Sequence, residues 1–115
     1  MEDNCLFCKI ASGAIPSSTV FEDEKCVAFN DITPQAPTHI LIIPREHLDS
    51  LDKAENGDEE LLGHLLLTVG RIARDKGFAE DGYRVVINTN GDGGQTVFHL
   101  HVHLLAGRPF VFPPG

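Results

Sequence analysis

The sequence predicts an α+β domain in which one long helix packs on one face of an antiparallel sheet. Residues 58–76 carry apolar side chains with a period near 3.6, which is typical of an amphipathic helix. Five shorter segments are rich in β-branched and aromatic residues, and most connections between neighbours are short, which favours antiparallel pairing. The chain has 115 residues, so we expect a single domain over residues 1–115.

The helices are expected from end signals as well as from periodicity. In the long helix, Asp58 stands where an N-cap is needed and Gly77 where a left-handed C-cap is needed. A short helix is expected at residues 5–12, with Asn4 as its N-cap and Gly13 at its end. The sequence thus predicts one long and one short helix.

The β segments are separated by turn-forming sequence. Two prolines make residues 31–38 a loop, and the glycine-rich residues 90–94 form a turn signal before the last strand. The tail at residues 109–115 has too many prolines for regular structure. We expect strands at residues 18–21, 25–29, 39–43, 83–89 and 97–105.

Composition and charge exclude several classes of protein. The formal net charge of −8 argues against nucleic acid and against an anionic membrane surface as partners, because both attract basic proteins. No apolar run approaches the roughly 20 residues of a membrane span. The acidic N-terminus at residues 1–4 lacks the basic and then apolar pattern of a signal peptide, so we expect a cytoplasmic protein. Three cysteines, an odd number, make a poor disulfide framework.

His99, His101 and His103 alternate with apolar residues in the last expected strand. Successive side chains of a strand point to opposite faces, so the imidazoles are expected on one face and the apolar side chains on the other, against the helix. Neighbouring imidazoles repel when protonated, so at least one is expected to be neutral at pH 7 and able to act as nucleophile or base. His-x-His is equally a pair of metal ligands, and the strand alone leaves both readings open.

The glycine-rich turn before this strand is compatible with a bound phosphate. Gly91, Gly93 and Gly94 let the backbone approach an anion closely, and successive N–H groups can surround phosphate oxygens. A plain hairpin turn explains the same composition.

Residues 99–105 match the pattern His-φ-His-φ-His-φ-φ, where φ is hydrophobic, and so resemble the histidine-triad superfamily. Residues 28–44, residues 92–98, Gly107-Arg108 and the tail at residues 112–115 resemble the Hint branch of that superfamily. The matching segments cover nearly the whole chain. The resemblance implies a five-stranded antiparallel sheet that pairs with a second copy in a homodimer.

The resemblance also implies an activity, that of a purine nucleoside phosphoramidase acting on adenosine or guanosine 5′-phosphoramidates and aminoacyl adenylates. No cofactor is required for catalysis in this family. By match to the motif, His101 is the nucleophile that forms a nucleotidyl-histidine, and His39 and His103 position it and share its proton. Asp31 would hold the ribose hydroxyls, although an aspartate in a proline-rich turn is more often a turn residue.

The remaining implied contacts concern the phosphate and the base. Taken alone, the aromatic and apolar residues among them would more often be ordinary core. The implied phosphate contacts are Asn88, Gly94, Gln95 and the backbone near Thr96, and the implied walls of the base pocket are Leu6, Phe7, Ile10, Phe29, Ile32 and Leu41.

Thr96 departs from the Hint branch, which usually has a serine there that donates to the leaving nitrogen. Threonine keeps the hydroxyl and adds a methyl group. We therefore expect activity to survive with an altered rate or leaving-group preference.

Cys5 and Cys8 form a C-x-x-C pair, and a structural zinc site needs four ligands. His47 and His99 could supply the other two, and related histidine-triad proteins carry such a site with the first triad histidine as a ligand. A redox pair or two buried thiols are the alternatives.

Other functions remain open. A dinucleoside polyphosphate hydrolase of the Fhit type is one, and a nucleotidyltransferase is another, although that branch has glutamine at the position of His103. A metal-dependent enzyme would use the three histidines as ligands directly. A nucleotide-binding or scaffold protein would need no turnover.

Overall fold

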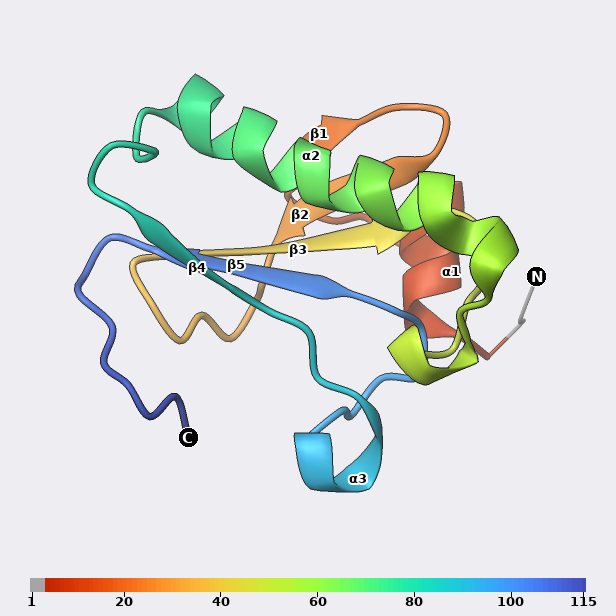
Figure 1. Ribbon diagram of the computed structural model, residues 1–115. Coiled ribbons are helices and arrows are strands. Elements are labelled where there is room, and N and C mark those ends of the chain that lie inside the picture. The colour runs from red at the N-terminus through yellow and green to blue at the C-terminus, as the bar shows by residue number, and fades with distance from the viewer. Residues whose placement is uncertain (1–3) are drawn as a thin grey trace.

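The computed structural model describes residues 4–115, and the acidic residues 1–3 that entered the signal-peptide expectation lie outside them. One long helix runs across one face of a five-stranded antiparallel sheet, and a short helix lies against the other face (Figure 1). The strands are β1 (Thr19–Glu22), β2 (Cys26–Asn30), β3 (Thr38–Pro44), β4 (Tyr83–Val86) and β5 (Val102–Ala106), and the helices are α1 (Leu6–Ser12), α2 (Glu59–Lys76) and the single turn α3 (Asn90–Gly93). The strand order is β1-β2-β3-β5-β4.

Alternation along the central strands divides the core into two layers. Ala28 of β2 and Ile42 of β3 face α2 and pack with its buried side chains. Phe29 and Leu41, one residue away in each strand, face α1 instead and pack against Phe7. Because α1 has only seven residues, it covers only part of its face of the sheet. The predicted α+β fold with one long and one short helix is confirmed.

The predicted C-cap of each helix and the N-cap position of α2 at Asp58 are confirmed, but the predicted N-cap of α1 is wrong. Gly13 and Gly77 are both left-handed C-caps, with φ of 82° and 86°. Asp58 does not cap α2 with its side chain; its carboxylate accepts the Glu55 N–H at 2.9 Å and closes a 3₁₀ turn before the helix. The N-cap of α1 is Cys5 rather than Asn4, because the Cys5 Sγ accepts the Cys8 N–H at 3.3 Å. No helix within residues 4–115 is long and apolar enough to cross a bilayer.

The last strand is shorter than expected because β3 ends in a proline. Ile42 pairs with Val102, and continued pairing would bring Leu100 opposite Pro44, which has no N–H to donate. Residues 97–101 therefore leave the ladder, and the Leu100 N–H donates to the carbonyl of Leu48 at 2.6 Å. The expectation of a strand from residue 97 was wrong, although the alternation of side chains survives, with Leu100 and Val102 packed in the layer under α2.

The strand expected at residues 83–89 also stops early, at Val86, which pairs with His103. The chain then leaves the sheet and forms α3 from residues that were expected as a turn (Figure 1). Asn90 begins this helical turn with φ of 59°, and Gly94 ends it in the left-handed region. Asn88 consequently lies beyond the strand in which it was placed.

Gly107 follows β5 with φ of +100°, and a Cβ built on it would lie 2.7 Å from the Pro37 Cβ. We predict that Gly107→Ala lowers the free energy of unfolding by about 1–3 kcal/mol, because it adds both backbone strain and overpacking. Denaturant unfolding measures the change. Gly63→Ala, on α2 with nothing within 4 Å of the added carbon, is the matched control and is expected to be neutral or stabilising. Equal stability of Gly107→Ala and wild type would contradict the prediction.

Candidate active site and metal centre

Three histidines gather on the face of the sheet that α1 leaves partly open. His39 of β3 and His103 of β5 are diagonal neighbours across the ladder, and their Nε2 and Nδ1 atoms lie 2.9 Å apart. The ring centroids of His101 and His103 are 5.0 Å apart, and the Phe7 ring meets His101 edge-on at 5.1 Å. Residues distant in the sequence thus form one compact group of imidazoles beside an aromatic wall.

The protonation of His101 follows from its hydrogen bond. Its Nδ1 lies 2.8 Å from the carbonyl oxygen of His99, and a carbonyl only accepts, so Nδ1 carries the hydrogen. The Nε2 atom makes no hydrogen bond within residues 4–115, and in the neutral ring it keeps its lone pair. A neutral imidazole with a directed lone pair is a nucleophile or a base.

The same reasoning orders the hydrogens of His39 and His103. The Gln35 N–H donates to Nδ1 of His39 at 3.1 Å, so the other ring nitrogen of the neutral His39 donates to Nδ1 of His103. The hydrogen of neutral His103 is then on Nε2, which is buried and has no partner among the described residues. A buried donor without a partner is rare in proteins and points to a group supplied by a ligand.

Burial keeps this pair neutral. Desolvation, followed by repulsion from His101 and His39, lowers the pKa of His103 to about 4. Desolvation also lowers the pKa of His39, against the opposing attraction of Asp31.

Asp31 takes part both in a turn and in the histidine group. One carboxylate oxygen accepts the Thr33 N–H at 2.8 Å, as expected of a turn residue. The other lies 3.5 Å from Nε2 of His39. The turn role is therefore present, and the same side chain borders the histidine group.

The glycine-rich loop does not present all its N–H groups to a phosphate, as the sequence allowed. The N–H groups of Gly94 and Gln95 point back to the carbonyls of Gly91 and Asn90 and are not available to an anion. The Gln95 side chain is buried and bonded to backbone groups on both sides of the loop. Thr96, by contrast, has neither an N–H nor a hydroxyl partner within residues 4–115, so both remain free for a ligand.

The apolar residues expected in the base pocket are distributed unevenly. Phe7, Phe29 and Leu41 belong to the buried layer under α1, which is the core role that the sequence left open. Leu6 is about half exposed and Ile32 is 98% exposed, so both side chains have free surface toward solvent. Ile10 is partly buried against the same layer.

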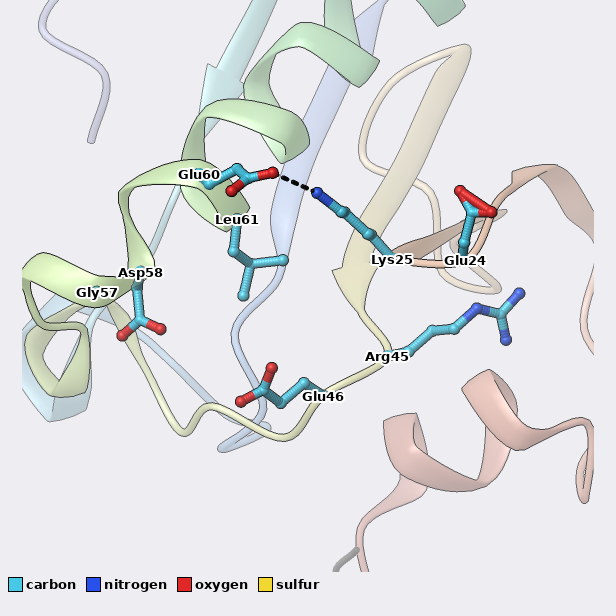
Figure 2. A pocket seen from close by; sticks show the side chains of 8 residues that line it. All are labelled: Glu24, Lys25, Arg45, Glu46, Gly57, Asp58, Glu60 and Leu61. Atoms are coloured by element: carbon cyan, nitrogen blue, oxygen red, sulfur yellow. Dashed lines mark hydrogen bonds and ion pairs between the residues drawn. The ribbon is translucent and has the colours of Figure 1, made fainter.

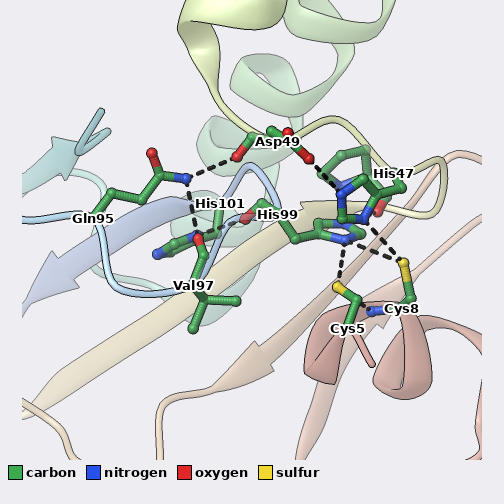
Figure 3. Close-up of polar contacts among 9 residues, drawn as sticks. Cys5, Cys8, His47, Asp49, Gln95, Val97, His99 and His101 are labelled. Atoms are coloured by element: carbon green, nitrogen blue, oxygen red, sulfur yellow. Dashed lines mark hydrogen bonds and ion pairs between the residues drawn. The ribbon is translucent and has the colours of Figure 1, made fainter. Parts of the chain in front are cut away.

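A second cluster lies at the N-terminus of α1. Donor atoms of Cys5, Cys8, His47 and His99 all lie within 4.8 Å of one another (Figure 3). Nδ1 of His99 is 3.3 Å from the Cys5 Sγ and 3.5 Å from the Cys8 Sγ, and Nδ1 of His47 is 3.3 Å from the Cys8 Sγ. The four residues predicted from the sequence as a zinc set are brought together.

The cluster also has the outer contacts that a metal site needs. Nε2 of His47 donates to the Asp49 carboxylate at 2.6 Å, and Nε2 of His99 donates to the Pro44 carbonyl at 2.8 Å. Each ring therefore turns the lone pair of its Nδ1 toward the cysteines. Two sulfurs and two imidazole nitrogens at these separations fit the tetrahedral geometry of zinc. Asp49 was not anticipated, although its position two residues after His47 could have indicated it.

His99 is thereby separated from the other triad members. Its ring belongs to the cysteine cluster, and only its carbonyl takes part in the histidine group. A metal-dependent enzyme that coordinates its metal with all three triad histidines is inconsistent with this geometry. Asp31, His39 and His103 do converge within 4.8 Å, but hydrogen bonding already explains the closest approach.

A charged hollow of about 360 Å³ lies away from both clusters, where β2 and β3 meet the start of α2 (Figure 2). Its two basic side chains are already bound: Lys25 pairs with Glu60 at 2.9 Å, and Arg45 pairs with Glu22 at 3.0 Å. The hollow contains none of the residues predicted for the active site. Its lining is Glu24, Lys25, Arg45, Glu46, Gly57, Asp58, Glu60 and Leu61.

Comparison with known proteins places these features in a family. Residues 12–110 match the HIT domain. The chain is 52% identical over 115 residues to an uncharacterized HIT-like protein of Synechococcus elongatus, covering all of both chains. It is 54% identical over 112 residues to a 14 kDa zinc-binding protein of Zea mays, covering 96% of this chain and 87% of that one. The structure matches a HIT family hydrolase from Legionella pneumophila Philadelphia 1 with a TM-score of 0.96 at 52% identity, covering 97% and 100% of the two chains.

The low pKa of His103 predicts acid sensitivity. Below its unfolded pKa of 6.5 and down to about 4, the unfolded chain binds more protons at this position than the folded chain. The free energy of unfolding should therefore fall as pH decreases from 6.5 toward 4, and His103→Asn should reduce this slope. Denaturant unfolding at several pH values measures it, and NMR should show the imidazole of His103 titrating near 4. Identical slopes for variant and wild type would contradict the prediction.

Proposed function

This chain belongs to the HIT family, and on that premise we propose that it hydrolyses purine nucleoside 5′-phosphoramidates and aminoacyl adenylates through a nucleotidyl-histidine on His101. The observation that carries the proposal is the state of His101. Its Nδ1–H is bound to the His99 carbonyl while Nε2 has no partner within residues 4–115. A histidine held in this way is prepared for attack on phosphorus.

In the first step, Nε2 of His101 forms a bond to phosphorus as the bond to the leaving nitrogen breaks. The ring becomes cationic, and the His99 carbonyl stabilises that charge through the Nδ1–H. The leaving amine must gain a proton. The free hydroxyl of Thr96 would pass it a proton and take one from solvent, while the unpartnered Nε2–H of neutral His103, which is connected to His39, would donate a hydrogen bond to the reacting phosphate.

In the second step, water attacks phosphorus and the bond to His101 breaks. Nucleoside monophosphate leaves, and the imidazole returns to its starting state. The attacking water releases to solvent the proton that the amine took up in the first step, and burial favours neutral His39 and His103 throughout. No step requires a metal ion.

The rest of the nucleotide would lie along the open part of the α1 face. One carboxylate oxygen of Asp31 is held by its turn, and the other, near His39, would accept hydrogen bonds from the ribose diol. Phosphate contacts are proposed for Asn88 and Thr96, whereas the Gly94 and Gln95 N–H groups are already bonded within the loop. The purine would rest against the exposed parts of Leu6, Ile10 and Ile32, backed by the buried Phe7, Phe29 and Leu41.

We further propose that the cysteine cluster holds a structural zinc ion. Cys5, Cys8, His47 and His99 would supply the four ligands and leave no coordination position for substrate, which is typical of structural sites. The bound metal would supply only stability, by fixing α1 to the segments that carry His47 and His99.

A homodimer is the proposed assembly. β4 is an edge strand of the sheet, and its Tyr83 and Val85 side chains are 38% and 39% exposed. Unpaired edges with apolar side chains are sites of pairing with another chain. Pairing of two β4 strands would produce a continuous sheet.

Removing the nucleophile should abolish turnover. We expect His101→Ala to lower kcat for adenosine 5′-phosphoramidate by about 10³-fold or more, because no other group replaces the covalent step. Release of AMP under brief exposure to chelator measures the rate, and wild-type activity should survive that exposure. His64→Ala, on α2 and outside the site, is the matched histidine control. Turnover by His101→Ala at the wild-type rate would refute the mechanism, and tight AMP binding without wild-type turnover would favour a nucleotide-binding protein.

Metal content tests the zinc site. Protein prepared without added zinc should contain about one zinc per chain, and Cys8→Ser should lose both the metal and thermal stability. Cys26→Ala is the control, since Cys26 lies in the core under α2, where burial raises its thiol pKa to about 11. A zinc content near zero, with Cys5 and Cys8 both reacting freely with a thiol reagent, would eliminate the site.

A further inference from the structure

We propose that Gln95 is a positioning residue for the proposed reaction, holding the loop that carries Thr96 against the segment that carries His47. This inference rests on the proposed function and assigns Gln95 a role other than direct contact with substrate. It follows from the hydrogen bonds of its side chain (Figure 3).

The Gln95 side chain is used entirely within the protein. It is 6% exposed, its Oε1 accepts the Asn90 N–H at 2.9 Å, and its Nε2 donates to the carbonyls of Asp49 at 2.8 Å and Val97 at 3.0 Å. The orientation of the amide is fixed by chemistry, because the two carbonyls only accept and the N–H only donates. Both amide hydrogens and the amide oxygen are therefore occupied.

Two of these bonds hold the loop around Gln95 itself, and the third joins it to a segment 46 residues away. Asn90 begins α3, Val97 leads into the triad, and Asp49 lies in the segment between β3 and α2. The Asp49 carboxylate binds His47, while its carbonyl binds Gln95. Asp49 thus links the side-chain amide of Gln95 to the cluster of Cys5, Cys8, His47 and His99.

Thr96 depends on this arrangement because it makes no hydrogen bond of its own within residues 4–115. Its position is set by the bonds of Gln95 before it and by the Val97 carbonyl after it. A shift of about 1 Å in a group that acts on the leaving nitrogen costs on the order of 10²-fold in rate. Gln95 should therefore affect the chemical step more than nucleotide binding.

Two substitutions of similar length separate its contacts. Gln95→Glu keeps an acceptor for Asn90 but cannot donate to Asp49 and Val97, and Gln95→Met removes all three bonds. For both variants we expect kcat for adenosine 5′-phosphoramidate to fall at least tenfold, while the Kd for AMP changes less than about threefold. In NMR spectra, AMP should shift the Thr96 amide in wild type and no longer do so in the variants.

Val69→Ala serves as the control for a general loss of stability. It removes core volume under α2 and lies outside the site. It should lower Tm while keeping kcat and the Thr96 shift. The proposal is overturned if the Gln95 variants keep kcat and the Thr96 shift within twofold of wild type. It is also overturned if Val69→Ala at matched stability loses as much kcat. A wild type that neither turns over the phosphoramidate nor binds AMP would instead refute the proposed function.

Discussion

The ladder between β3 and β5 ends at the pair Ile42–Val102, just before Pro44, which has no N–H to donate, and the arrangement of the candidate site depends on that end. The chain before β5 is released from the sheet, and the Pro44 carbonyl accepts the Nε2–H of His99. That bond turns Nδ1 of His99 toward Cys5 and Cys8. The His99 carbonyl is then left to fix the hydrogen of His101. Residues in one alternating run thereby come to serve two different clusters.

His39 and His103 of the candidate site are neutral in a chain whose formal net charge is −8. Burial lowers the pKa of His39 and His103, so the hydrogen-bonded pair needs no counter-charge beyond Asp31. Lys25 and Arg45 are engaged in ion pairs elsewhere on the surface. Recognition of an anionic substrate would then rely on oriented N–H and O–H donors, which explains why a strongly acidic chain can carry such a site.

The fold class and the long helix could be predicted, because periodicity and glycine end signals are local properties. The C-x-x-C pair is local too, whereas its grouping with His47 and His99 was expected from the resemblance to histidine-triad proteins. The first residue of β5 could not be predicted, because it depends on the register with β3, in which continued pairing would place Leu100 opposite Pro44. The Asn4 cap was wrong because the Cys5 sulfur competes successfully for the same end of α1. The link between Gln95 and Asp49 could not be predicted from the sequence, because it joins positions 46 residues apart, whereas the contact of Asp49 with His47 is local.

Cys5 has two duties, since its sulfur both caps α1 and faces His99. A substitution at Cys5 alone would leave the cluster with three of its four candidate metal ligands. It would also remove the N-cap of the helix that carries Phe7, whose ring contacts His101. The four cluster positions are therefore expected to change together during divergence rather than one at a time. Lineages that abandon the cluster should retain a capping residue such as serine or aspartate where Cys5 stands. In such proteins the cap of the helix would be kept although the metal ligands are lost.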